Sequence, residues 1–391
     1  MTSVQLATNS GLFEEALQVL PGGNTRSTLF VPPSAPYAAA GEGAYVTDVD
    51  GHKVIDCNNN YTSLIHGHKF RPVLDKVHEV IEESTSFGLP TESEIRLAQE
   101  LSRRLPASEQ WRFVNSGTEA VMQAIRIARA YTGRDIIVRF AGSYHGTSDA
   151  VIDPAMPGIP RSAADSVITL PIGDAESFTH LFHERGQDVA AVLIDLMPNR
   201  AGLKPADESF VTLVRERTRA HDALLIIDEV ITFRSSFGGL QGVYGVEPDL
   251  TTLGKVIGGG FPVGAVGGKA AIMATTNPAL PGTVAWGGTF SANPVTMNAG
   301  LTALDSFRQD TIEKLNSRGN ALREGLLQAG IHCSGFGSLI RIFPKDMNAA
   351  WWRAYHEGIL LGTSGLIALS TAMDDATIEN ILQGIIRAYR N

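Results

Sequence analysis

The sequence has few of the features that mark secreted, membrane-bound or nucleic-acid-binding proteins. Its 391 residues include two cysteines, Cys57 and Cys333, which form no CxxC pair, so we expect core residues rather than a disulfide framework. The net charge is −9 with no basic tract, which disfavours nucleic acid as a partner. A run of about 18 apolar residues and a basic, then apolar, amino terminus are both absent. We therefore predict no membrane span and a cytoplasmic location.

The remaining composition is that of an ordinary globular protein. It is 43% hydrophobic and 19% charged. Many of its 40 glycines follow residue 235, which indicates a site built partly from backbone. The length suits one large and one small domain.

From residue 111 onward, strand-like and helix-like segments alternate. The near-continuous apolar runs "VAAVLIDLM" (189–197) and "ALLIIDEV" (223–230) flank a helical pattern at 209–221, which predicts a parallel sheet covered on both faces. Helices are also expected near 11–20, 70–85, 91–105 and 118–132, and a hairpin around Asp50–Gly51. We predict a large α/β domain over 51–295 and a smaller one over 296–391, with which segment 1–50 packs.

Two ionisable residues lie among apolar neighbours. Asp228 ends the strand "LLIID", where open α/β sheets bind their ligands, although a helix cap or a salt bridge would explain it equally well. Lys255 precedes three glycines, and a lysine in an apolar site loses its proton more easily, as Schiff-base chemistry requires. Considered alone, such a lysine is more often a surface residue.

The stretch "VNSGTEA" lies where a strand leads into a helix. Ser116, Gly117 and Thr118 offer hydroxyl and backbone donors at the positive end of a helix, which is typical of a phosphate site; a simple capped turn is the alternative. Thr289, in the small-residue cluster "GGTFSANP", could donate to the same anion. The P-loop, dinucleotide, GxSxG and HExxH patterns are absent, and we predict no metal site.

A phosphate site, a carboxylate at a strand end and a lysine in an apolar pocket together match pyridoxal phosphate (PLP), with its phosphate, pyridine nitrogen and aldehyde. Tyr144, in "YHG", could lie flat against the pyridine ring, although an aromatic residue after a strand is more often in the core. The adjacent His145 fits a satisfied buried histidine equally well.

The motifs "FVNSGTEAVMQAIRIARAYTGRDIIVRFAGSYHG", "DEV", "PDLTTLGKVIGGGFPVGAVGG" and "GTFSANP" resemble those of the class III aminotransferases. The likeness is greatest to the branch that holds glutamate-1-semialdehyde aminomutase and the β-amino acid aminotransferases. It implies a fold-type I homodimer with active sites at the subunit interface. Lys255 would form the Schiff base and carry the substrate proton, and Asp228 would pair with the pyridine nitrogen. Val230 and Tyr144 would cover the two ring faces, and Thr289 would come from the neighbouring subunit.

Three stretches depart from the family pattern. "DEVITFR" is one residue shorter than the usual form, as in the β-amino acid branch. Asp195–Leu196 stands where the family usually has Glu-Pro. Arg200 lies near a position at which asparagine is common in the family. Thr363 and Ser364 occupy the place where β-amino acid aminotransferases carry an arginine for the acceptor's carboxylate. The acceptor is therefore left open.

Arg26 resembles the arginine that binds a substrate carboxylate in the β-amino acid branch, a task that suits a planar guanidinium. A solvated loop arginine is the alternative. Arg341 is a second candidate, although a strand arginine is more often structural. Tyr61 and Trp286 could shape the pocket, and core packing explains both almost as well.

Three functions are consistent with these residues. The first is a ping-pong aminotransferase that moves an amino group from a β-amino acid, or a similar carboxylated amine, to a keto or aldehyde acceptor through Lys255. The second is an intramolecular aminomutase of the glutamate-1-semialdehyde type. The third is a non-catalytic cofactor-binding protein, against which the retained Lys255 and Asp228 argue.

Overall fold

The computed structural model describes residues 7–153 and 156–390, which divide into two compact units. One unit is formed by residues 71–313, and the other by the residues up to 70 together with those from 314 onward. The predicted domain boundaries at 50/51 and 295/296 differ from this division. The first would separate the two strands of one hairpin, whose backbone hydrogen bonds hold them in a single sheet.

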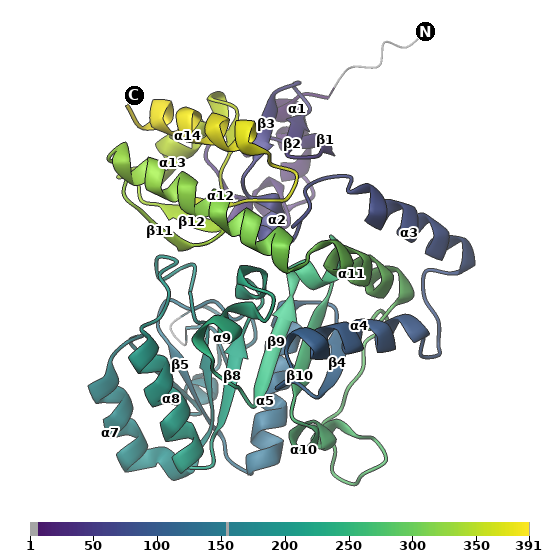
Figure 1. Ribbon diagram of the computed structural model, residues 1–391, viewed down its shortest axis with the longest axis vertical. Helices are drawn as coiled ribbons and strands as arrows, with labels where there is room; N and C mark the ends of the chain where they lie inside the picture. Colours follow the sequence, from purple (N-terminus) through teal and green to yellow (C-terminus); the bar gives the residue numbers. More distant parts are fainter. Residues whose placement is uncertain (1–6, 154–155, 391) are drawn as a thin grey trace. The chain divides into compact units, whose positions relative to one another are not determined.

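The larger unit contains a seven-stranded sheet in the order β4-β10-β9-β8-β7-β5-β6 (Figure 1). Only β10 is antiparallel to its neighbours; the other pairs are parallel. The strands are β4 (Gln110–Val114), β10 (Gly264–Gly268), β9 (Leu250–Gly254), β8 (Leu224–Asp228), β7 (Val189–Ile194), β5 (Ile136–Phe140) and β6 (Val167–Leu170). The predicted, mostly parallel α/β sheet is confirmed.

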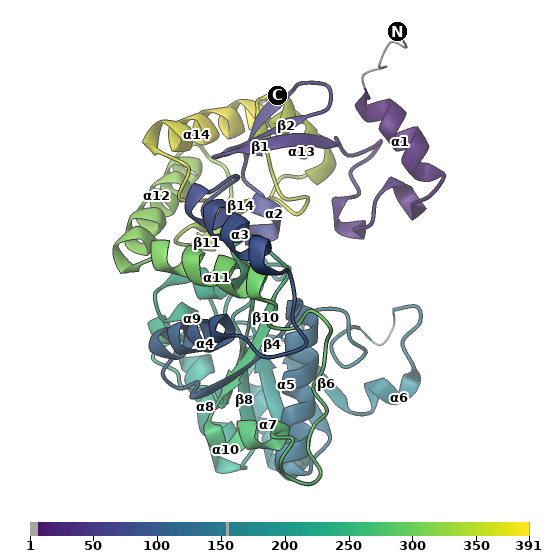
Figure 2. The same cartoon turned by 90° about the vertical axis from the view of Figure 1, so that its right-hand side faces the viewer.

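Helices cover both faces of this sheet. α8 (Glu208–Ala220) packs on β7 and β8, and α5 (Gly117–Thr132) packs on β10, β9 and β7 from the opposite side (Figures 1 and 2). Every residue of β7 and β8 is consequently buried, which explains why both strands read as continuous apolar runs. α5 ends where predicted, at Gly133, whose φ of 66° is left-handed.

The other helices of the larger unit lie before, between and after the strands. They are α3 (Arg71–Glu83), α4 (Glu92–Arg104), α6 (Arg161–Ala164), α7 (Ala175–Arg185), α9 (Gly239–Tyr244), α10 (Ala270–Met273) and α11 (Pro294–Ser306). The predicted helices near 70–85 and 91–105 correspond to α3 and α4. α12 (Gln309–Gln328) crosses the boundary between the units.

The smaller unit combines the two ends of the chain. Its four-stranded sheet has the order β1-β2-β3-β13, and a three-stranded sheet has the order β11-β12-β14. The strands are β1 (Ala38–Glu42), β2 (Tyr45–Asp48), β3 (Lys53–Asp56), β11 (Cys333–Phe336), β12 (Leu339–Ile342), β13 (Ile359–Leu360) and β14 (Leu366–Ala368), and the helices are α1 (Asn9–Leu17), α2 (Asn59–Thr62), α13 (Met347–His356) and α14 (Asp375–Arg390). The predicted hairpin is β2–β3, which turns at Gly51 with φ 90°.

The segment assigned as α2 has an unusual backbone. All four of its residues, Asn59 to Thr62, have positive φ angles between 47° and 75°. Each left-handed residue other than glycine costs on the order of 1–2 kcal/mol. Such strain persists where the surrounding structure holds it, and here Asn59 Nδ2 donates to Ala368 O at 2.6 Å while Asn58 Oδ1 accepts from Tyr61 N.

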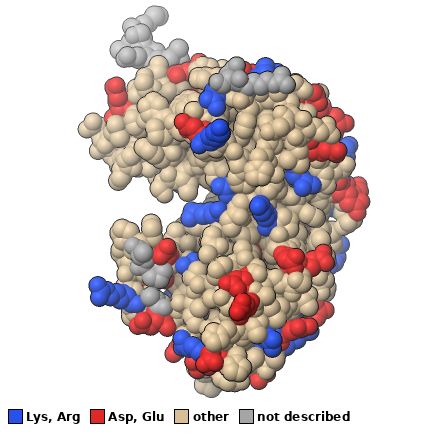
Figure 3. Space-filling model, turned by 90° about the vertical axis from the view of Figure 1, so that its left-hand side faces the viewer, with Lys and Arg blue, Asp and Glu red and all other residues tan. Residues whose placement is uncertain are grey.

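Acidic and basic side chains are interspersed on the face drawn in Figure 3, with no broad field of one sign. Among the described residues, no helix combines the length and apolar character needed to cross a membrane. Cys57 and Cys333 are both buried free thiols, as core residues should be.

Candidate active site

Lys255 follows β9 directly and begins a short 3-10 turn. Its backbone is left-handed, with φ 51°, at the junction between the strand and the glycine-rich loop. Burial lowers the pKa of Lys255, while the carboxylates of Asp228 and Asp195 act in the opposite direction. The structure therefore brings Lys255 into the electrostatic range of two acids at the ends of neighbouring strands.

Asp228 is the last residue of β8 and is 5% exposed. Its Oδ2 lies 2.7 Å from Nδ1 of His145, which is also buried. Its Oδ1 accepts from Val230 N at 3.0 Å and from Thr252 Oγ1 at 3.2 Å. Three donors from separate segments thus fix the carboxylate in one orientation.

Asp195 lies one strand away, directly after β7. Its Oδ1 accepts from Met197 N at 2.9 Å. Burial, and then the nearby charge of Asp228, raise the pKa of Asp195 to about 7. Because two buried carboxylates stand together at this edge, adding negative charge to Asp195 is costly near neutral pH.

The "VNSGTEA" stretch forms the start of α5. Ser116 is the N-cap: its Oγ accepts from Glu119 N at 3.1 Å and lies 3.3 Å from Glu119 Oε2. The hydroxyl of Ser116 is therefore engaged within the chain. The backbone N–H groups of Gly117 and Thr118 make no hydrogen bond to the described residues, so they remain available to an anion at the helix terminus.

Close packing around glycine brings the separate motifs together. A Cβ on Gly117 would lie 3.0 Å from Val230 Cγ1, and one on Gly254 would lie 3.4 Å from the same atom. A Cβ on Gly146 would lie 2.6 Å from Thr118 Oγ1. The start of α5, the end of β8, the strand before Lys255 and the "YHG" loop therefore meet in one region of the larger unit.

Tyr144 has an unexpected neighbour. The guanidinium carbon of Arg200 lies 4.1 Å from the centre of the Tyr144 ring, a stacked cation–π arrangement. Tyr144 is 43% exposed. One face of the ring is thus covered by a cation from the same unit.

Trp286, which precedes the "GGTFSANP" cluster, and Ser291, within it, contact residues just before α5. Trp286 Nε1 donates to Phe113 O at 3.0 Å, and Asn115 Nδ2 is 3.5 Å from Ser291 Oγ. Trp286 also packs against the core. Thr289 itself is exposed.

Arg26 belongs to the smaller unit. Its Nη1 donates to Asn60 Oδ1 at 2.8 Å, and its guanidinium carbon lies 5.2 Å from the centre of the Tyr61 ring. Thr363 Oγ1 donates to Thr28 O at 2.9 Å, near the same segment. Arg341 lies on β12 with its guanidinium carbon 5.6 Å from the Phe343 ring, and burial lowers its pKa.

Sequence reasoning did not assign the residues that surround Asp228. His145 was left open between a functional and a structural role, and Thr252 was not singled out. The only signal was that His145 directly follows Tyr144. Which carboxylate a histidine meets depends on chain topology, because His145 and Asp228 are 83 residues apart.

Comparison with known proteins assigns the chain to a family. Residues 33–388 match the model of the class-III aminotransferases, so the chain belongs to this family. A glutamate-1-semialdehyde 2,1-aminomutase 2 from Bacillus licheniformis is 38% identical over 96% of each chain.

Solved structures share the fold. An ω-transaminase from Sphaerobacter thermophilus is 40% identical, with a TM-score of 0.94 over 98% of this chain and 97% of that one. A transaminase with PLP bound is 35% identical, with a TM-score of 0.94 over 97% and 96%. A β-phenylalanine aminotransferase from Variovorax paradoxus is 33% identical, with a TM-score of 0.91 over 97% and 93%. The predicted fold-type I architecture of PLP-dependent transferases is confirmed.

Proposed function

We propose that this chain is a PLP-dependent aminotransferase that moves an amino group from a β-amino acid, or a similar carboxylated amine, to a keto or aldehyde acceptor. The observation that carries the proposal is the placement of Lys255 directly after β9: Thr252 of this strand pairs with Asp228, and Gly254 packs against Gly117 at the open N–H groups that begin α5. Family membership and the likeness to two transaminases at 33% and 40% identity support it.

The residues present fit pyridoxal phosphate. Gly117 and Thr118 offer unpaired N–H groups for a phosphate, and the absence of a side chain at Gly117 leaves room that Val230 borders. The firmly oriented carboxylate of Asp228 suits a protonated pyridine nitrogen. Val230 and Tyr144 are the groups that would border the ring.

When bound, the cofactor supplies an aldehyde that takes up the substrate amine and a ring that withdraws electrons from it. The chain supplies the positioning and the proton transfer. Burial keeps a larger fraction of Lys255 Nζ unprotonated than is usual for lysine, so this nitrogen can take the proton from the amine-bearing carbon. His145 holds Asp228 in place through the 2.7 Å contact.

We propose Arg26 as the group that binds the substrate carboxylate. Among the described residues no carboxylate pairs with it, so its charge is not neutralised within the chain. A guanidinium binds a carboxylate through two parallel hydrogen bonds. We propose further that the enzyme is a homodimer in which the neighbouring subunit's Thr289 reaches the phosphate; the exposure of Thr289 and of Phe290 (61%) supports this arrangement.

An aminomutase of the glutamate-1-semialdehyde type is the second candidate. The Bacillus licheniformis relative carries that name at 38% identity over nearly the full length of both chains. Thr363 and Ser364 in place of an acceptor-binding arginine also suit a reaction that needs no separate acceptor.

An absorption spectrum tests the proposal. The purified protein is loaded with PLP and recorded before and after racemic β-phenylalanine is added without an acceptor. We expect the visible band to convert to the shorter-wavelength band of pyridoxamine phosphate. An unchanged band would remove this donor and favour the aminomutase, which the same assay with glutamate-1-semialdehyde would test. Failure to take up PLP would overturn the cofactor assignment.

A further inference from the structure

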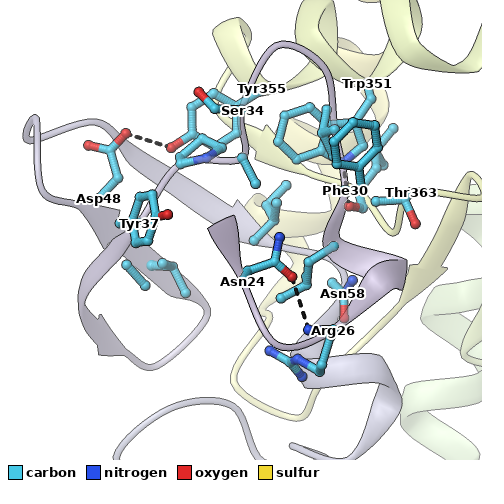
Figure 4. A pocket seen from close by; sticks show the side chains of 18 of the residues that line it. Asn24, Arg26, Phe30, Ser34, Tyr37, Asp48, Asn58, Trp351, Tyr355 and Thr363 are labelled. Atoms are coloured by element: carbon cyan, nitrogen blue, oxygen red, sulfur yellow. Dashed lines mark hydrogen bonds between the residues drawn. The ribbon is translucent and has the colours of Figure 1, made fainter. Parts of the chain in front are cut away.

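Two exposed arginines lie over aromatic rings and have no acidic partner among the described residues. Arg26 lies at the edge of a cavity of about 370 Å³ in the smaller unit (Figure 4), and the proposed function gives it a role. Arg200 lies in the larger unit, with its guanidinium carbon 4.1 Å from the centre of the Tyr144 ring. The Tyr144 ring borders the proposed cofactor site, but Arg200 has no role in the proposed function.

Arg200 lies on an anchored turn between β7 and α8. In this turn the backbone N–H groups of Ala201 and Leu203 both donate to Pro198 O, at 3.2 and 3.0 Å. The Leu203 side chain is fully buried. The backbone that carries Arg200 is therefore fixed in place, although the arginine side chain itself is exposed.

The loop that carries Tyr144 packs directly on this turn. A Cβ on Gly142 would lie 2.8 Å from Ala201 Cβ. His145, the next residue after Tyr144, is buried and held through its Nδ1 atom. The Tyr144 side chain, by contrast, is 43% exposed and makes no hydrogen bond to the described residues. The stacked guanidinium is therefore the contact that fixes the orientation of the ring.

We propose that Arg200 is a positioning residue, whose guanidinium covers one face of the Tyr144 ring and holds the opposite face toward the cofactor ring. The inference rests on the proposed function in taking Tyr144 as a neighbour of PLP. A planar guanidinium stacks on an aromatic face, which leaves the second face for another partner. A side chain that is already held in place loses less conformational entropy when a ligand binds against it.

Calorimetric titration of the cofactor-free protein with pyridoxamine phosphate tests the proposal. This probe has the ring and the phosphate of the cofactor but lacks the aldehyde, so its binding needs no covalent link to Lys255. In Arg200→Ala the Tyr144 ring loses its support, and we expect the dissociation constant to rise about 2- to 10-fold, the effect of immobilising one side chain. Because Arg200 is exposed, this substitution removes no buried contact.

Arg219→Ala is the matched control for the lost charge. Arg219 is also exposed, but it lies in the last turn of α8, which precedes the start of β8 rather than the end that carries Asp228. We expect this variant to bind pyridoxamine phosphate as the unaltered protein does.

A double-mutant cycle with Tyr144→Leu shows whether Arg200 acts through the ring. We expect Arg200→Ala to weaken binding when Tyr144 is present and to have no further effect when it is replaced. Arg200→Lys keeps the charge but not the planar group, so it should recover only part of the loss. The visible circular dichroism of PLP, per mole bound, should also decrease in Arg200→Ala, because a mobile ring gives the cofactor less fixed surroundings.

The outcomes separate this proposal from the function on which it rests. An unchanged dissociation constant in Arg200→Ala, or an equal rise with and without Tyr144, overturns the proposal. Full recovery in Arg200→Lys overturns it because charge alone would then suffice, and this comparison still decides if Tyr144→Leu fails to fold. Tighter binding in Arg200→Ala overturns it because the guanidinium would then occupy the face that the cofactor needs. The cofactor assignment itself would fail if the unaltered protein did not bind pyridoxamine phosphate.

Discussion

Asp228 of the larger unit and Arg26 of the smaller unit have opposite surroundings. In the larger unit, Asp228 receives three donors from its own chain, and Lys255 lies within range of two acids. In the smaller unit, Arg26 meets a neutral amide and an aromatic ring, and no carboxylate among the described residues pairs with it. The carboxylate of Asp228 is held by donors of its own chain, whereas the guanidinium of Arg26 keeps a charge that no described carboxylate neutralises.

This difference matches two proposed tasks, action on a cofactor by the larger unit and recognition of a substrate by Arg26. Groups that act on a cofactor must be oriented before it arrives, because misplacement by about 1 Å can cost about 10²-fold in rate. A group that recognises a changing substrate needs charge that the chain has not neutralised. Four substitutions test that separation.

Lys255→Ala should lower kcat by at least about 10³-fold, since positioned proton transfer alone contributes about 10²–10⁴-fold. PLP should still bind through the donors at the start of α5. Turnover and bound cofactor are measured together, with Lys269→Ala as the control, because Lys269 pairs with Asp249. Substantial residual turnover would contradict the role given to Lys255.

Asp228→Asn should lower kcat by about 10²-fold or more while the KM for the amine changes little. A neutral amide cannot pair with a positively charged ring nitrogen as a carboxylate does. Steady-state kinetics measure the effect. His145→Gln, which keeps a polar side chain beside Asp228, should give a smaller loss in the same direction; a larger loss would place the main role on the histidine.

Asp195→Asn should flatten the pH dependence of the stability of the cofactor-free protein. The pKa of Asp195 rises from 3.8 to about 7 on folding, so between these pH values the folded chain binds more protons than the unfolded chain, and stability falls as pH increases. Between pH 5 and pH 8, the free energy of unfolding of the variant should fall by on the order of 2 kcal/mol less than that of the unaltered protein. Urea unfolding at both values checks this; equal pH slopes would rule out Asp195.

Asn60→Gly should raise the KM for carboxylated amines about fivefold, the value of one hydrogen bond, with kcat unchanged. Glycine tolerates the left-handed φ of 47° at this position, so the substitution removes the amide and spares the backbone. A carboxylate-free amine serves as the control substrate. An equal rise in its KM would mean that Asn60 does not act through Arg26.

Local patterns predicted much of the fold. The apolar runs at 189–197 and 223–230, the β2–β3 hairpin and the Gly133 helix end follow from periodicity and turn chemistry that operate over a few residues. The pairing of His145 with Asp228 and the stacking of Arg200 on Tyr144 could not be predicted in this way. Both depend on which segments the sheet brings together, as does a cavity bordered by Phe13 and Trp351.

The parallel pairing of β3 with β13 has a consequence during synthesis. Ile55 pairs with Ile359, so one edge of β3 has no partner until about 300 further residues have been translated. At a synthesis rate of about 5–20 residues per second, that edge stays unpaired for roughly 15–60 s. An unpaired strand edge invites pairing with other chains. The nascent chain is therefore more prone to pair with other chains until residues 359–360 have been translated.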